Sequence, residues 1–83
     1  MIYLIFTQEG FEEAQSVLLA EKSTLWVNDD FLSEAQSSLL TQGGVEVNYF
    51  PQTVDTNNEK SILAALKDVE KSSPKAEIFV EYL

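Results

Sequence analysis

The sequence predicts a small α/β domain in which strands and helices alternate. The first observation is an echo 21 residues apart: 13–16 (Glu-Ala-Gln-Ser) recurs at 34–37, so a strand followed by an amphipathic helix occurs twice. The second is a looser third unit, with a strand over 45–50 and a helix over 58–70, and the third is a closing strand over 76–83. Alternating strands and helices require a mostly parallel sheet, and we expect one domain spanning residues 1–83.

The four predicted strands are of two kinds. Residues 2–6 and 25–27 are apolar at consecutive positions, as is typical of strands covered on both faces. Residues 45–49 and 77–82 alternate apolar with polar side chains, as is typical of strands with one packed face. With right-handed crossovers, this division favours a four-stranded parallel sheet of order 2-1-3-4, with helix one on one face and helices two and three on the other. The expected fold is a three-layer βαβαβαβ domain, a truncated doubly wound sheet of the flavodoxin-like kind.

Three amphipathic helices are predicted from apolar residues at helical spacing. Ser33 with Gln36, and Thr56 with Glu59, have the spacing of a capping box at a helix start. Glycines at 43–44 end the second helix, and the segment 72–74 ends the third. The three apolar stripes are Phe11, Ala14, Val17 and Leu18; Leu32, Ala35, Leu39 and Leu40; and Ile62, Leu63, Leu66 and Val69.

Missing residue types exclude several chemistries. The chain has no Cys and no His, which excludes disulfides, a Cys/His zinc site and the commonest general base. All five cationic side chains are lysines, so arginine clamps on phosphate are excluded as well. We therefore expect a protein without a cofactor, and a non-catalytic role rather than an enzyme.

The net charge of −9 is concentrated in the first two thirds of the chain. Residues 1–55 hold nine acids against Lys22, whereas residues 56–83 hold five acids against four lysines. This charge would repel a nucleic-acid backbone, so no direct nucleic-acid binding is expected. The excess acids are either a solvated surface or a surface that attracts a basic protein partner. The acids expected to contact such a partner are Glu12, Glu13, Asp29 and Asp30.

Acidic residues also follow three of the predicted strands. In the order 2-1-3-4, ligands would bind between strands one and three, and Glu9, Asp30 and Asp55 lie in the loops that face this crevice. Three carboxylates could hold Mg²⁺ for an enzyme or a phosphoacceptor. The architecture resembles that of receiver domains, but no lysine follows Lys75 in the final strand. The more common role of such residues is to cap helices, so both interpretations stay open.

The last strand is expected at an edge of the sheet. Glu77 and Glu81 are typical of charges that prevent unwanted strand pairing. Phe79 lies between them and could anchor a partner or a second copy of the chain. A homodimer formed through this strand, or through the open face of the sheet, is therefore an alternative expectation.

The leading functional hypothesis is a small acidic protein-binding module, an inhibitor or adaptor for a basic partner. In architecture and charge it resembles the barstar class of small acidic α/β inhibitors. The alternatives are the magnesium-dependent enzyme or phosphoacceptor and the self-associating structural subunit. Residues 1–6 form the longest apolar run, far below the ~20 residues that cross a bilayer, and no basic leader precedes them. We therefore expect a cytoplasmic protein that does not enter membranes.

Overall fold

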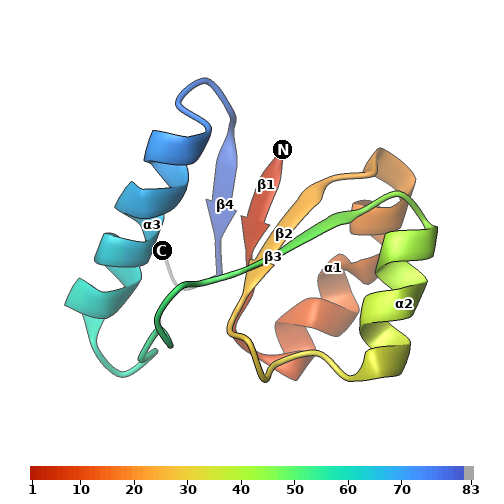
Figure 1. Cartoon of the computed structure of the whole chain (residues 1–83), viewed down its shortest axis with the longest axis horizontal. Helices are drawn as coiled ribbons and strands as arrows, with labels where there is room; N and C mark the ends of the chain where they lie inside the picture. The colour runs from red at the N-terminus through yellow and green to blue at the C-terminus, as the bar shows by residue number, and fades with distance from the viewer. Residues whose placement is uncertain (82–83) are drawn as a thin grey trace.

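The computed structural model describes residues 1–81 and contains a four-stranded parallel sheet with helices on both faces (Figure 1). This confirms the small α/β class that the sequence predicts. The predicted last strand extended to Leu83, and Tyr82 and Leu83 lie outside the described residues. The elements in chain order are β1 (Ile2–Leu4), α1 (Gln8–Glu21), β2 (Thr24–Val27), α2 (Glu34–Gln42), β3 (Glu46–Tyr49), α3 (Glu59–Ser72) and β4 (Ile78–Val80).

The strands lie in the order β3-β2-β1-β4, which corrects the expected order 2-1-3-4. β3 pairs with β2 and β4 pairs with β1, so β3 and β4 are the two edges of the sheet. The alternation of side chains identified the two strands with one covered face. It could not identify their neighbours, because a strand covered on one face alternates in the same way at either edge.

The helices form two layers around two separate apolar cores. The chain moves from β1 to β2 to β3 in one direction and then returns across the sheet to β4, so right-handed crossovers place α1 and α2 on one face and α3 on the other (Figure 1). This corrects the expectation that helices two and three share a face. The first core includes Phe11, Leu18, Leu25, Val27 and Leu40. The second includes Ile2, Leu4, Phe50, Ile62, Ala65, Val69 and Val80.

The helix ends follow local rules of capping. The predicted capping box of Ser33 and Gln36 is present at the start of α2. α3 begins instead at Asn58, whose side chain accepts a hydrogen bond from the Lys60 amide, so the predicted capping by Thr56 is wrong. Two glycines end α2 as expected, and Gly44 adopts a φ of 89° that other residues avoid.

One side of α1 is left uncovered. The predicted apolar stripe is buried at Phe11 and Leu18, but Val17 remains 40 % exposed. Tyr3 of β1 is the register partner of Phe79 of β4, and Phe79 is 44 % exposed. α1 and α2 pack over β1, β2 and β3, so within residues 1–81 no helix covers this face of β4.

No helix among residues 1–81 is long and apolar enough to cross a membrane.

Candidate binding surface

The strand order moves the place where a ligand would be expected. In doubly wound sheets, ligands bind beyond the carboxyl ends of the strands, at the point where the strand order reverses. That point lies between β1 and β4, and β2 separates β1 from β3. The crevice expected between strands one and three is therefore not formed. The corresponding position is the start of α1 beside the end of β4.

The carboxylate of Glu81 occupies this position. Its Oε1 accepts hydrogen bonds from the amides of Phe6 at 2.6 Å and Thr7 at 3.0 Å, and its Oε2 accepts one from the Thr7 hydroxyl. Both amides lie just before Gln8, the first residue of α1, and the start of such a helix is the usual phosphate position in doubly wound proteins. The chain thus places its own anion at this position, and Glu81 does not act as the simple edge charge that the sequence suggested.

Gly10 allows this close approach. A Cβ on Gly10 would lie 2.7 Å from the Cδ atom of Glu81, well inside van der Waals contact. Gly10 is in the first turn of α1, where glycine is otherwise unfavourable by about 0.5–1 kcal/mol relative to alanine. Its place in the helix is therefore explained by the carboxylate that packs against it.

The carboxyl end of β2 is also closed by the chain itself. The Asn28 side chain donates to the Val54 carbonyl at 3.2 Å and accepts from the Val54 amide at 2.8 Å, which holds the β3–α3 loop over the end of β2. Below this loop, the ring of Phe50 stacks on Phe6 with centroids 5.9 Å apart and lies 5.7 Å from Trp26.

The three carboxylates expected to hold magnesium do not form a ligand set. Among residues 1–81, no group of three or more acidic side chains could hold a metal ion. Glu9 lies in the first turn of α1, Asp30 lies in the turn after β2, and Asp55 accepts a hydrogen bond from the Asn57 amide at 2.9 Å. Glu9 and Asp55 thus have the local role of charges and caps at helix starts and turns.

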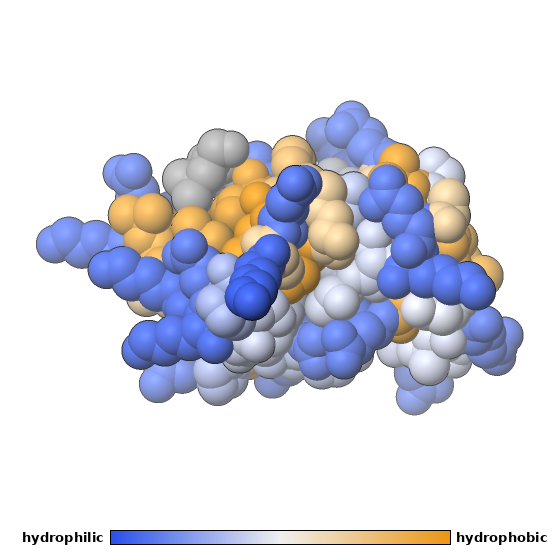
Figure 2. Space-filling view, turned by 90° about the horizontal axis from the view of Figure 1, so that it is seen from above, coloured by the Kyte–Doolittle hydropathy of each residue, from blue (hydrophilic) through white to orange (hydrophobic). Residues whose placement is uncertain are grey.

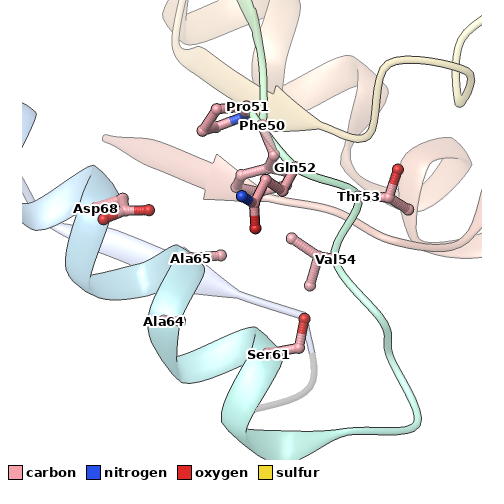
Figure 3. A pocket seen from close by; sticks show the side chains of 9 residues that line it. All are labelled: Phe50, Pro51, Gln52, Thr53, Val54, Ser61, Ala64, Ala65 and Asp68. Atoms are coloured by element: carbon pink, nitrogen blue, oxygen red, sulfur yellow. The ribbon is translucent and has the colours of Figure 1, made fainter.

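A small cavity lies between the β3–α3 loop and α3 (Figure 3). Its volume is about 250 Å³. Gln52 and Val54 point into it from the loop, while Ser61, Ala65 and Asp68 line it from the helix. The Ser61 hydroxyl accepts a hydrogen bond from the Asp55 amide at 3.0 Å, so it is committed to the loop. Asp68 is the one titratable side chain of the lining, and the cavity holds no pair of acid and base.

Most of the excess acidic residues belong to α1, to the start of α2 and to the loop between β2 and α2. The starts of α1 and α2 are joined through Gln8, which donates to the Phe31 carbonyl at 3.0 Å and accepts from the Gln36 side chain at 3.1 Å. Residues 8–34 carry seven carboxylates and one lysine, and we call these carboxylates the acidic face. They are Glu9, Glu12, Glu13, Glu21, Asp29, Asp30 and Glu34. The four that the sequence assigned to a partner surface are all exposed.

The opposite layer is electrically balanced. α3 carries three acids and three lysines, and it packs on the other face of the sheet. The acids are Glu59, Asp68 and Glu70, and the lysines are Lys60, Lys67 and Lys71. The helices on the two faces of the sheet therefore differ in charge, since α1 and α2 carry five acids and no lysine.

An apolar recess lies beside the acidic face, between α1 and β4. Its volume is about 450 Å³, and we call it the α1–β4 recess. Phe79 lies in it, the Tyr3 and Phe79 ring centroids are 5.7 Å apart, and Glu77 is exposed just before β4. Burial, and after it the nearby carboxylate of Glu21, raises the pKa of Tyr3. The lining residues are Tyr3, Ile5, Gly10, Glu13, Ala14, Val17, Phe79 and Glu81.

Sequence reasoning missed the roles of Gly10 and Asn28. A glycine in the first turn of a predicted helix is a signal of close approach, but the sequence does not name the group that approaches it. Asn28 after a strand is typical of a cap or turn, and its pairing with Val54 depends on how a distant loop is folded. No protein-family model, no curated protein and no solved structure matches this chain.

Proposed function

We propose that this protein is a small non-catalytic binding module whose acidic face engages a basic surface of a partner protein. The observation that carries the proposal is the division of charge across the sheet, with seven carboxylates and one lysine in residues 8–34 and a balanced α3 on the other face. A surface of one sign attracts a partner of opposite sign and orients it during encounter. Such a module would act as an inhibitor or adaptor by covering that basic surface.

The geometry of the ligand position supports binding through the surface. In the loop before α1 the Glu81 carboxylate accepts hydrogen bonds from the Phe6 and Thr7 amides and from the Thr7 hydroxyl, so a negative charge already lies beside the helix start. At the carboxyl end of β2 the pairing of Asn28 with Val54 holds the β3–α3 loop over the strand. The exposed acids of α1 and of the β2–α2 loop are, by contrast, open to a partner.

Two variants with the same net charge test the proposal. The first, E12Q/E13Q/D29N/D30N, removes four charges from the acidic face. The second, E46Q/E59Q/D68N/E70Q, removes four charges from the α3 side of the sheet; Glu46 belongs to that side because it shares a register row with Thr24 and the buried Ile2. Each protein is immobilised and exposed to lysate of the source cell at low salt, and the bound proteins are eluted with increasing NaCl.

We expect the wild type and the α3-side variant to retain the same basic protein, and the acidic-face variant to lose it. The retained protein should elute as salt rises, because screening weakens interactions between exposed charges. Far-UV circular dichroism of each variant checks that the fold is intact. Equal retention by all three proteins, or retention that does not depend on salt, would contradict the proposal.

Self-association is a second candidate function, favoured by the exposure of Phe79 on an edge strand. Two copies would each carry a charge of −9, which disfavours their contact at low salt. Sedimentation equilibrium at low and high NaCl distinguishes the two functions. A monomer under both conditions rules out self-association, and a dimer that F79S abolishes supports it.

A further inference from the structure

We propose that the α1–β4 recess holds an apolar side chain of the basic partner segment, and so supplies the specificity that charge alone lacks. The inference rests on the proposed function, because the recess adjoins the acidic face. It assigns a distinct task to residues that are not acidic. The partner feature that fits this surface is a large apolar side chain flanked by lysines or arginines.

The walls of the recess come from two elements. Gly10, Glu13, Ala14 and Val17 have the spacing of one face of a helix, and they form the α1 wall. The floor consists of Tyr3 from β1, Ile5 just after this strand, and Phe79 from β4. At about 450 Å³ the recess falls within the usual range of ligand pockets and accommodates a large side chain.

The exposed apolar groups show where an occupant would gain most. Val17 is 40 % exposed and Phe79 is 44 % exposed, although Ile5 beneath them is buried. An apolar side chain placed between α1 and β4 would remove both from water, and burial of apolar surface is the main favourable term in association. A tryptophan or tyrosine would also stack near the Tyr3–Phe79 pair.

Charge decides which occupant is favoured. Glu13 and Glu81 belong to the lining, and Glu9 and Glu12 lie on the same helix, whereas the lining includes no lysine. A second copy of this chain would bring a further net charge of −9 to a rim that is already acidic. A segment with cations on both sides of its apolar residue is complementary to both the rim and the floor.

Apolar surface is also present on the other side of β4. Viewed from above, hydrophobic surface is concentrated toward the α3 side of the molecule and is surrounded by hydrophilic side chains (Figure 2). A shallow hollow on that side is lined by Leu66, Ile78 and Val80 together with Glu70 and Ala76. Its lining has one carboxylate and adjoins the balanced α3, whereas the α1–β4 recess has two and adjoins the acidic face, so the charge argument favours the recess.

Three synthetic peptides, acetylated and amidated, serve as probes. The first has a central tryptophan with two lysines on each side, the second has glycine in place of tryptophan, and the third has serines in place of the lysines. Binding is followed by chemical shifts of ¹⁵N- and methyl-labelled protein at low salt. We expect the tryptophan–lysine peptide to bind at least about 10-fold more tightly than the other two and to shift the signals of Ala14, Val17 and Phe79.

Surface variants show whether the recess is responsible. V17S and F79S should each bring the affinities of the tryptophan–lysine and glycine–lysine peptides to about the same value. The control L63S, which alters an equally exposed leucine of α3, should keep the wild-type ratio of these affinities. E12Q/E13Q/D29N/D30N should weaken both lysine peptides by a similar factor. Val17, Phe79 and Leu63 are exposed, so these serine variants are expected to stay folded, as amide spectra will show.

The outcomes separate this inference from the proposed function. Equal, salt-sensitive binding of the tryptophan and glycine peptides would overturn the recess and leave the acidic face supported. If the peptide with tryptophan and serines binds as tightly as the tryptophan–lysine peptide, the requirement for a basic partner is overturned. A lack of shifts with every peptide at millimolar concentration would also overturn the recess, while the lysate experiment would still judge the acidic face.

Discussion

The contact between Glu81 and Gly10 decides which charged group lies at the carboxyl end of β4, beside the start of α1. The loop that enters α1 offers the amides of Phe6 and Thr7, and the chain satisfies them with its own carboxylate, placed beside the positive end of the helix. Gly10 is the residue that makes room for this carboxylate. A phosphate placed beside this contact would meet the negative charge of Glu81, which disfavours phosphate binding at this position.

Because of this contact, we expect G10A to change the free energy of unfolding in opposite directions in the presence and in the absence of Glu81. In wild type, G10A should destabilise the fold by about 1 kcal/mol or more, because the new methyl group displaces a charge-assisted acceptor. E81A alone should cost about 2 kcal/mol. In the E81A background, G10A should instead stabilise by about 0.5–1 kcal/mol, the usual gain of alanine over glycine in a helix.

Urea unfolding of the four proteins in this double-mutant cycle measures the effect. E77A is the control, since Glu77 is exposed beside the same strand and should change the free energy of unfolding by no more than about 0.5 kcal/mol. If G10A has the same sign in both backgrounds, the Glu81 carboxylate does not pack against Gly10 in solution.

We expect ionisation of Tyr3 to lower the free energy of unfolding at alkaline pH. Burial and the Glu21 carboxylate raise the pKa of its hydroxyl above the ordinary value of 10.0. The folded state therefore holds this proton more tightly than the unfolded state, so the contribution is complete below pH 10 and is lost as pH rises through the folded pKa. Y3F should show a smaller fall in the free energy of unfolding above pH 10.

Unfolding at intervals from pH 8 to about pH 11 provides the comparison for Tyr3. Y49F is the matched control, because Tyr49 is 43 % exposed and its replacement leaves Tyr3 in place. The variant should follow the wild-type curve. Identical curves for Y3F and wild type would show that Tyr3 does not couple its ionisation to folding.

At the scale of elements, the echo in the sequence is close to a structural repeat but does not coincide with it. The echo has a spacing of 21 residues and aligns Leu18 with Leu39, yet Leu18 is fully buried and Leu39 is 47 % exposed. The structure repeats at 22 residues, because Ile2 is the register partner of Thr24 and the buried Leu18 corresponds to the buried Leu40. Packing against the sheet, rather than identity of residues, decides the equivalent positions.

The position of the β3–α3 loop depends on the two hydrogen bonds between the Asn28 side chain and the Val54 backbone. N28A should destabilise the fold by about 1–3 kcal/mol, since it leaves the partly buried amide and carbonyl of Val54 without their partner. The loop should also open locally, so the Val54 amide should exchange with solvent much faster than the amides of β1.

Hydrogen exchange followed by NMR tests this loop directly. N57A is the control, because the Asn57 amide, rather than its side chain, contacts Asp55. We expect its Val54 amide to stay as protected as in wild type. Unchanged protection of Val54 in N28A would show that burial of the Val54 side chain, not Asn28, holds the loop.

At the scale of the whole molecule, the uneven charge should cost stability. The carboxylates of the acidic face repel one another with one lysine among them, whereas α3 has as many lysines as acids. The variant E12Q/E13Q/D29N/D30N should therefore be more stable than wild type at low ionic strength, and its midpoint temperature should rise less when NaCl is added.

The α3-side variant E46Q/E59Q/D68N/E70Q provides the matched comparison. It should gain less than the acidic-face variant, or lose stability, because the acids of α3 share their helix with three lysines and Glu59 is a favourable charge at the start of α3. Thermal unfolding at 10 mM and 500 mM NaCl measures both. Equal gains in the two variants would mean that net charge alone, and not its position, sets the cost.

The sequence by itself determined the features that depend on local periodicity and on the inventory of residue types. It predicted the succession of strands and helices along the chain, the capping box at Ser33 and the α/β class, because each depends on neighbours along the chain. It also excluded chemistry that needs histidine, cysteine or arginine. The exposure of Glu12, Glu13, Asp29 and Asp30 followed from their charge.

Only the tertiary structure decided which strands are neighbours and which side chains lie at the carboxyl ends of the strands. Alternation of side chains does not distinguish β3 beside β1 from β3 beside β2, since either position leaves one face covered. The separation of Glu9, Asp30 and Asp55, the approach of Glu81 to Gly10, and the recess between α1 and β4 all follow from that order. These features join residues far apart along the chain, and local sequence patterns do not record such contacts.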